Sequence, residues 1–259
     1  MTDRASSQIP RLSEKYNIAI REDRQIEQRV LQNLGQEFGV LRSGIHVSDL
    51  VLCLRQAAFR KLRPVPFTLK QLGYFLDGAR RHEALQRLYS QNDPAHIINE
   101  KKGIFEDVSY SIDIYHSIPI EFKTTRSNSV ISDHWIRQLA YYMLAVNSNI
   151  GILQLQRIMA RREDGIFPAF LVEFSTEIQR TTWLREFRKR RDLLHNALVK
   201  KDPALAPIER GEGRWVCRDC QYSAECDIIE LQSHVGQLGQ LGASNKKLDN
   251  CRESEGVPP

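Results

Sequence analysis

The sequence contains no apolar run that approaches the roughly 20 residues needed to span a bilayer, and its first residues include no hydrophobic signal region. These two absences predict a soluble cytoplasmic protein with no membrane partner. No internal repeat and no extended low-complexity tract occurs. The charge is not strongly one-sided, since 37 Lys and Arg face 32 Asp and Glu. This mild excess is compatible with a polyanionic partner but does not require one.

The chain has 259 residues, of which 41% are hydrophobic, so it can bury a sizeable core without covalent staples. Disulfides are rare in cytoplasmic proteins. The five cysteines therefore need another role.

The spacing of apolar residues predicts helices at both ends of the chain and strands in the middle. Helices are expected over residues 21–38, 46–62, 69–90, 132–146 and 176–200. Ser48 is expected to cap the second helix, because its hydroxyl oxygen can accept a free amide of the first turn. About three strands are expected in residues 96–123, and a hairpin that turns at Asp164-Gly165 in residues 151–174. This order predicts an α/β or α+β domain, and not an up-down bundle.

The stretch from Ser111 to Lys123 has the pattern of two short strands, yet it carries two acids and a lysine. Residues two apart in a strand share a face, so Glu121 and Lys123 point the same way. If the connection contains an odd number of residues, Asp113 lies opposite Glu121. Two carboxylates so close repel each other unless a cation lies between them, and Mg²⁺ and Mn²⁺ favour such oxygen ligands. An exposed hairpin with surface ion pairs would show the same spacing, so other features must decide.

Two of the expected helices carry further polar residues of this kind. His82, on the third helix, is a candidate metal ligand, although it shares a helical stripe with apolar residues and would also fit as a half-buried helix histidine. Gln138 and Tyr142 lie four residues apart, and both are expected to face away from the core. An amide beside a phenol can bind a phosphate or a sugar edge. An ordinary polar helix surface would look the same.

Three cysteines form the pattern C-x2-C-x5-C at Cys217, Cys220 and Cys226. A tetrahedral metal site needs a fourth ligand, which Cys53 can supply if the first helices pack against the C-terminal segment. Cys251 competes for this role from a segment that is expected to be a weakly ordered tail. Four thiolates suit either zinc or an iron–sulfur cluster, and the spacing alone does not choose between them.

Together these features resemble the RecB-like branch of the PD-(D/E)XK nucleases, and more closely the CRISPR-associated exonucleases with an iron–sulfur cluster. The resemblance covers roughly residues 45–228. The motifs occur in the family's order as Cys53, G-x-x-x-H ending at His82, Asp113, E-x-K at Glu121 to Lys123, Q-x-x-x-Y at Gln138 to Tyr142, and the three late cysteines. Two departures occur, because Ile112 stands where the superfamily has its proline and no proline follows Cys53.

The resemblance implies a PD-(D/E)XK restriction-endonuclease-like core, in which helices flank a central mixed sheet. It implies a metal-dependent DNA exonuclease, which is a phosphodiesterase. The catalytic Mg²⁺ or Mn²⁺ would be held by His82, Asp113, Glu121 and the backbone carbonyl of Phe122. Lys123 would position the attacking water.

The resemblance also implies partners and a second cofactor. Gln138 and Tyr142 would hold DNA, single-stranded or at a frayed end, near the metal. A [4Fe–4S] cluster would join the N- and C-terminal helical segments through Cys53, Cys217, Cys220 and Cys226. The implied setting is CRISPR adaptation, in which DNA is trimmed before the spacer integrase complex inserts it.

Four segments are expected: an N-terminal helical segment over 1–68, a nuclease core over 69–202, a cysteine segment over 203–228 and the tail over 229–259. Three other interpretations remain open, namely a stand-alone repair or phage-type nuclease, a DNA-binding assembly subunit with little catalysis, and a zinc-stapled binding protein. The last expected helix is ringed by basic residues, which suit a solvated surface and a DNA-attracting surface equally well. They are Arg180, Arg185, Arg188, Lys189, Arg190 and Arg191.

Overall fold

The computed structural model describes residues 24–38, 42–125, 131–158, 165–209, 215–218 and 220–232. The chain divides into two compact units, Met1–Val40 with Pro66–Arg80, and Leu41–Val65 with Arg81–Pro259. Among the described residues, no helix combines the length and the apolar character that crossing a membrane requires. The four expected segments stay a prediction.

The first unit contains α2 (Arg24–Phe38) and the first half of α5 (Leu69–Asn92). α2 lies where a helix was expected, and the expected residues 21–23 fall outside the described residues. A capping box begins α5, because the Thr68 hydroxyl accepts the Gln71 amide at 3.3 Å and the Gln71 side chain accepts the Thr68 amide at 2.9 Å.

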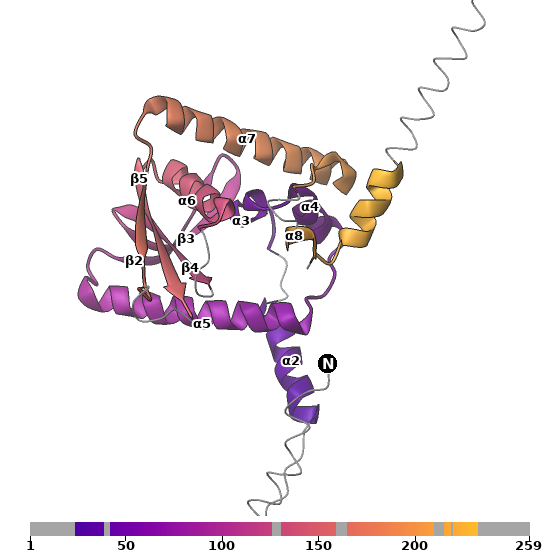
Figure 1. The fold of residues 1–259 in the computed structure, drawn as a ribbon, viewed down its shortest axis with the longest axis horizontal. Helices are drawn as coiled ribbons and strands as arrows, with labels where there is room; N and C mark the ends of the chain where they lie inside the picture. Colours follow the sequence, from indigo (N-terminus) through magenta and orange to yellow (C-terminus); the bar gives the residue numbers. More distant parts are fainter. Residues whose placement is uncertain are drawn as a thin grey trace, which may run out of the picture. The chain divides into compact units, whose positions relative to one another are not determined.

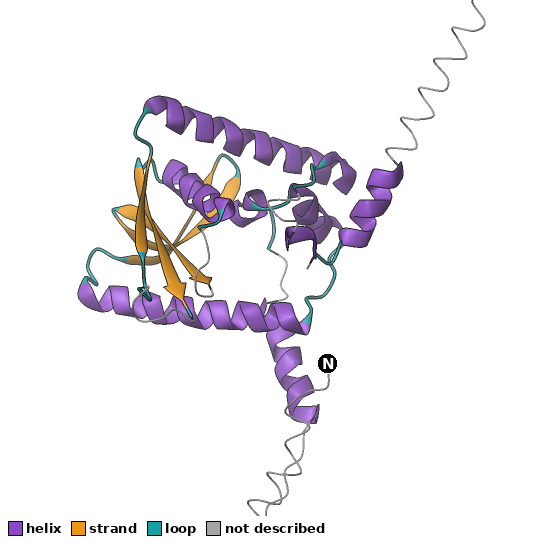
Figure 2. Cartoon of the chain, viewed as in Figure 1, coloured by secondary structure: helices purple, strands orange, loops and turns teal. Residues whose placement is uncertain are grey.

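The described residues of the second unit form one mixed sheet of six strands in the order β1-β3-β4-β5-β6, with β2 paired to β3. β4 and β5 run parallel, whereas β2–β3, β3–β4 and β5–β6 are antiparallel. The strands are coloured orange in Figure 2. Their bounds are β1 Ile45–His46, β2 Ile98–Phe105, β3 Val108–His116, β4 Ile118–Thr125, β5 Ile150–Arg157 and β6 Ala169–Glu173.

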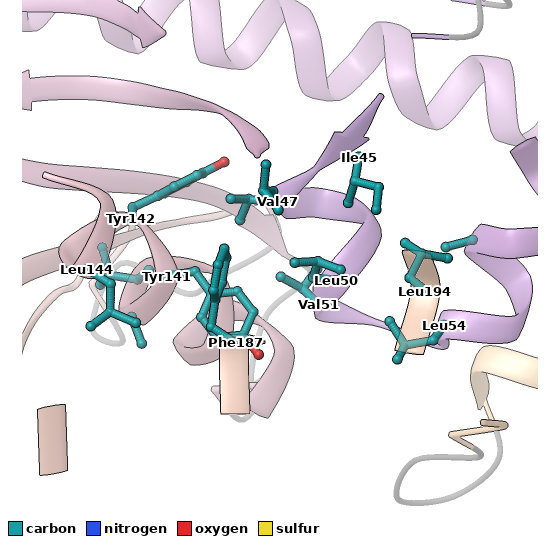
Figure 3. Close-up of a cluster of buried hydrophobic side chains, with 14 of the residues drawn as sticks. Ile45, Val47, Leu50, Val51, Leu54, Tyr141, Tyr142, Leu144, Phe187 and Leu194 are labelled. Carbon is teal, nitrogen blue, oxygen red and sulfur yellow. The ribbon is translucent and has the colours of Figure 1, made fainter. Parts of the chain in front are cut away.

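Helices pack on both faces of this sheet (Figure 1). α6 (Asp133–Ala145) and α7 (Glu177–Val199) share the main hydrophobic core with β3, β5 and the short helices near β1. Figure 3 shows part of this core, where Phe187 of α7 and Tyr141 of α6 lie together. The second half of α5 packs on the other side, where Leu85 joins Ile114, Ile120 and Phe122. The expected central mixed sheet flanked by helices is therefore confirmed.

Most expected elements occur at their predicted places. Three strands fill residues 96–123, and α6 follows Ser132 as expected. Thr176 caps α7 by accepting the Gln179 amide at 3.2 Å. β5 and β6 form the expected hairpin, although Asp164 of its predicted turn lies outside the described residues.

The expected single helix over residues 46–62 is wrong. The structure has two helices, α3 (Val47–Val51) and α4 (Leu54–Leu62), with a break at Leu52 and Cys53. His46, and not Ser48, is the N-cap of α3, and its amide donates to the Asp49 carboxylate at 2.9 Å.

Two arginines from distant helices explain the break. The guanidinium of Arg190, only 3% exposed, donates to the carbonyl of Leu50 at 2.5 Å and also to the carbonyl of Leu52. Arg137 donates to the carbonyl of Val51 at 2.7 Å. These carbonyls would otherwise accept helix amides, so the arginines satisfy them while the chain turns. Arg190 was expected among the basic residues on the surface of α7, and that expectation is wrong because its side chain is buried.

Candidate active site

The hairpin between β3 and β4 places Asp113 opposite Glu121. His116 pairs with Ile118, so Ser117 alone forms the connection, with a left-handed φ of 59°. A one-residue connection has an odd residue count, which is the condition under which Asp113 was expected to lie opposite Glu121. Extending this register along both strands sets Asp113 against Glu121.

β3 and β4 separate at Asp113. Within these described strands, their pairing stops at Ile114 and Ile120. The Asp113 carboxylate fills the gap, and its Oδ2 accepts the backbone amide of Phe122 at 2.8 Å. The pairing of β3 with β2 is also interrupted at Asp113. Glu100 is the residue of β2 at this position, and it has a left-handed φ of 50° and does not pair with Asp113. Because β3 and β4 separate, the Asp113 carboxylate lies between them. A continuous ladder would have only backbone hydrogen bonds at this position.

Glu121 is buried beside Lys123. Its side chain is 1% exposed, and one oxygen lies 2.5 Å from the ammonium of Lys123. The other oxygen, Oε2, is buried without a hydrogen-bond partner among the described residues. Burial and the charge of Asp113 raise the pKa of Glu121 to about 7, although Lys123 acts in the opposite direction. A half-satisfied buried carboxylate costs free energy, and such a cost is common at functional sites.

His82 reaches the same gap from α5. Its Nδ1 lies 3.5 Å from Oδ1 of Asp113. Burial lowers the pKa of His82, but its hydrogen bond to Asp113 and the nearby acids outweigh burial, so the net pKa is raised. Burial raises the pKa of Asp113, but His82, Lys123 and the Phe122 amide together leave it lowered. The pKa values of the two facing acids are therefore shifted in opposite directions, with that of Asp113 lowered and that of Glu121 raised.

Gln138 and Tyr142 of α6 complete a chain of hydrogen bonds. Lys123 donates to the Gln138 side-chain carbonyl at 2.9 Å, and the Gln138 amide donates to the Tyr142 hydroxyl at 2.9 Å. Gln138 therefore holds the ammonium in place. The expectation that Tyr142 faces away from the core is wrong, since it is 4% exposed and belongs to the main core. α6 is covered by the sheet, α3 and α7 together, so it has no single apolar face.

The types of side chain at this gap are ones that bind divalent cations. Two carboxylates and an imidazole come together, and one carboxylate oxygen has no hydrogen-bond partner in the part of the chain that the structure describes. As they stand, no three or more His, Cys, Asp and Glu side chains in the described residues are close enough to enclose a metal ion. The ammonium of Lys123 rests on Glu121 and supplies the positive charge that a cation would supply. Binding an ion would therefore require this ion pair to loosen.

The described cysteines gather in the second unit. Cys53 is buried at the N-cap of α4. Its charge acts on Cys220 and Cys226, and these two also sense Cys217, so the four thiols are electrostatic neighbours. None of the four forms a disulfide. Cys251, the competing ligand, lies outside the described residues.

Tyr222, which lies between Cys220 and Cys226, packs this segment against α4. Its ring stacks on Phe59 with centroids 5.1 Å apart, and its hydroxyl donates to the carbonyl of Arg63 at 3.2 Å. Residues 223–232 are helical, and they include the first residues of the expected tail. Residues 233–259 lie outside the described residues. The contact expected between the early helices and the C-terminal segment is therefore present.

Two thiols of this group, those of Cys220 and Cys226, have pKa values that burial raises. Burial raises the pKa of Cys226 to about 11, with the neighbouring cysteines adding to the effect and Arg55 opposing it. Burial also raises the pKa of Cys220. Cys220 has two donors on its sulfur, the Gln56 side chain and the Tyr222 amide, both at 3.5 Å. Such donors are typical around metal-bound thiolates.

Comparison with known proteins gives a structural likeness only. The chain matches no family model and no curated protein. It is similar to the crystal structure of SSO0001, with 19% sequence identity and a TM-score of 0.54, over 77% of this chain and 95% of that chain. This likeness shows that the fold is one already seen in a solved protein.

Two further solved structures are similar at lower scores. One is a phage related exonuclease from Haemophilus somnus 129PT, with 11% identity and a TM-score of 0.42, over 62% of this chain and 97% of that chain. The other is an alkaline exonuclease (LHK-Exo) from Laribacter hongkongensis, with 12% identity and a TM-score of 0.37, over 61% and 94%.

Proposed function

We propose that this protein is a metal-dependent DNA nuclease. The observation that carries the proposal is the gap between β3 and β4, where buried Glu121 keeps an unpartnered oxygen opposite Asp113. A plain structural ion pair would satisfy both oxygens, because a buried charge without partners is costly. Lys123 and His82 at the same gap supply the remaining polar groups of a phosphodiesterase site.

Each residue of the gap has a role that its surroundings support. His82, Asp113, Glu121 and the Phe122 carbonyl would hold Mg²⁺ or Mn²⁺, which when bound would polarise a phosphate and activate a water. The half-buried Lys123 ammonium would orient that water and offset negative charge that develops on the phosphate. Gln138 keeps the ammonium aimed at this position through its 2.9 Å hydrogen bond.

The finer assignment rests on the resemblance of the sequence motifs. It makes the protein an exonuclease of the PD-(D/E)XK superfamily that acts on single-stranded DNA or DNA ends. Its setting would be CRISPR spacer acquisition with the spacer integrase complex as partner. Gln138 would lie near the bound strand, and the buried Tyr142 would hold Gln138 in place by accepting its amide N–H.

The cysteine group supports a second cofactor. Four thiols are neighbours, and Cys220 already receives two hydrogen bonds to sulfur. They would hold a [4Fe–4S] cluster, and zinc is the alternative that the same ligands allow. The described side chains do not yet enclose an ion, so binding would deprotonate and draw together the thiols. A brown protein with a broad absorbance shoulder would favour the cluster over zinc.

The nuclease proposal is tested by Asp113→Ala. We expect this variant to lose cleavage of single-stranded DNA in Mn²⁺ or Mg²⁺, and EDTA to have the same effect on the unaltered protein. Asp192→Ala, at an exposed position of α7, is the matched control and should cleave normally. Circular dichroism should show both variants folded. Persistent cleavage by a clean Asp113→Ala preparation would remove Asp113 from the site, and DNA binding without any cleavage would favour the assembly-subunit interpretation.

A further inference from the structure

Arg55 is a buried arginine in the first turn of α4, and one of its donors is unused. The residue is 9% exposed. Its Nε donates to the carbonyl of Ala206 at 2.9 Å, and its Nη2 donates to the carbonyl of Ala204 at 3.2 Å. The remaining nitrogen, Nη1, is buried and has no hydrogen-bond partner within the described ranges of the chain. The guanidinium is therefore fixed in place with one N–H group left to bind something else.

Arg55 also lacks an anionic partner. No carboxylate in the described part of the chain forms an ion pair with it. Arg190, which is similarly buried, pairs with both Glu186 and Glu209. A guanidinium stays charged in proteins, and a buried charge costs free energy unless an opposite charge accompanies it. The two carbonyls accept hydrogen bonds from Arg55 but do not neutralise it.

The groups near Arg55 that can become anions are the cysteine thiols. Cys53 precedes it by two residues, at the N-cap of α4. The side chain of Gln56, the next residue of the helix, donates to the sulfur of Cys220 at 3.5 Å. The charge of Arg55 also acts on Cys226. The first turn of α4 therefore brings a buried cation to the same group of cysteines that it contacts through Gln56.

We propose that Arg55 is the counter-charge of the metal centre that the four cysteines would form, and that its Nη1 donates to a metal-bound thiolate. This inference rests on the cysteine centre proposed above and adds a residue that acts through the ligands. Four thiolates carry more negative charge than the Zn²⁺ ion or the iron–sulfur core that they hold, so the loaded centre is anionic. A buried anion of this kind is stabilised by a nearby cation and by N–H donors to its sulfurs.

The experiment measures the metal affinity of the full chain at one pH, under reducing and oxygen-free conditions. Co²⁺ binding is followed by the absorbance of its thiolate bonds, and Zn²⁺ binding by displacement of Co²⁺. Arg55→Gln should weaken both affinities by about 10- to 100-fold, the loss typical when a group that supports metal ligands is removed. Arg55→Lys keeps the charge and should retain most of the affinity. Arg185→Gln removes the same charge at an exposed position of α7 and should bind both metals normally.

Each outcome decides the inference. Arg55→Gln with the affinities of the unaltered protein would overturn it and leave the cysteine centre intact. Equal weakening by Arg55→Gln and Arg55→Lys, or misfolding of both in circular dichroism, would assign Arg55 only the structural role of holding Ala204 and Ala206, and would also overturn it. No binding of Co²⁺ or Zn²⁺ by the unaltered protein would overturn both this inference and the cysteine centre. Recovery of affinity in Arg55→Lys, with the same Co²⁺–thiolate absorbance at saturation in every variant, would support the counter-charge.

Discussion

Replacing Glu121 with Gln should make the metal-free protein more stable at alkaline pH. The pKa of Glu121 is raised from its ordinary 4.5 to about 7, so the folded protein binds the proton more tightly than the unfolded chain does. The stabilisation is fully present below the ordinary pKa and is lost as the pH rises through about 7. A shift of about 2.5 pKa units at 1.36 kcal/mol each corresponds to about 3 kcal/mol. Glutamine keeps the shape and carries no charge, so it should remove this loss.

The measurement is urea unfolding in EDTA from acid to mildly alkaline pH. The free energy of unfolding of the unaltered protein should fall by about 3 kcal/mol more than that of Glu121→Gln over this range. His82, whose pKa is raised in part by the charge of Glu121, loses stability in the same direction, and this loss should be smaller in Glu121→Gln. Glu173→Gln, at an exposed strand position, is the matched control and should follow the unaltered protein. Parallel pH profiles for Glu121→Gln and the unaltered protein would refute the reasoning, because the buried carboxylate would then carry no charge penalty.

Three further predictions concern other parts of the molecule. Cys226→Ala should lose bound iron or zinc and much of the stability, whereas removing the tail before Cys251 should leave the metal content unchanged; the opposite pattern in metal analysis would make Cys251 the ligand. Arg190→Leu should lower the free energy of unfolding by about 3 kcal/mol, because it leaves two carbonyls and one oxygen of Glu209 without their donor; a loss below about 1 kcal/mol in urea unfolding would contradict this. Lys123→Met should abolish cleavage but keep oligonucleotide binding in EDTA, and normal turnover by this variant would remove Lys123 from catalysis.

The sequence alone determined the parts of this protein that depend on neighbours along the chain. Strand alternation predicted that an odd connection would set Asp113 against Glu121, because a side-chain period of two leaves only two faces to choose from, and the structure supplies the one-residue connection. Helix periodicity placed α6 and α7, and Ser132 and Thr176 marked their starts. The spacing of the late cysteines indicated a metal site for the same reason, since those residues lie within ten positions of the sequence.

Only the tertiary structure decided features whose cause lies far away in the chain. The break before Cys53 is set by Arg190, 140 residues from the Leu50 carbonyl that it binds, so local propensity predicted one continuous helix there. Tyr142 is buried because three elements surround α6, a condition that no helical stripe reveals. The raised pKa of Glu121 likewise comes from burial beside Asp113, and burial is a property of the assembled sheet and helices. Residue types and spacing therefore predicted which groups form the candidate site, while their contacts and charge states depended on packing between distant segments.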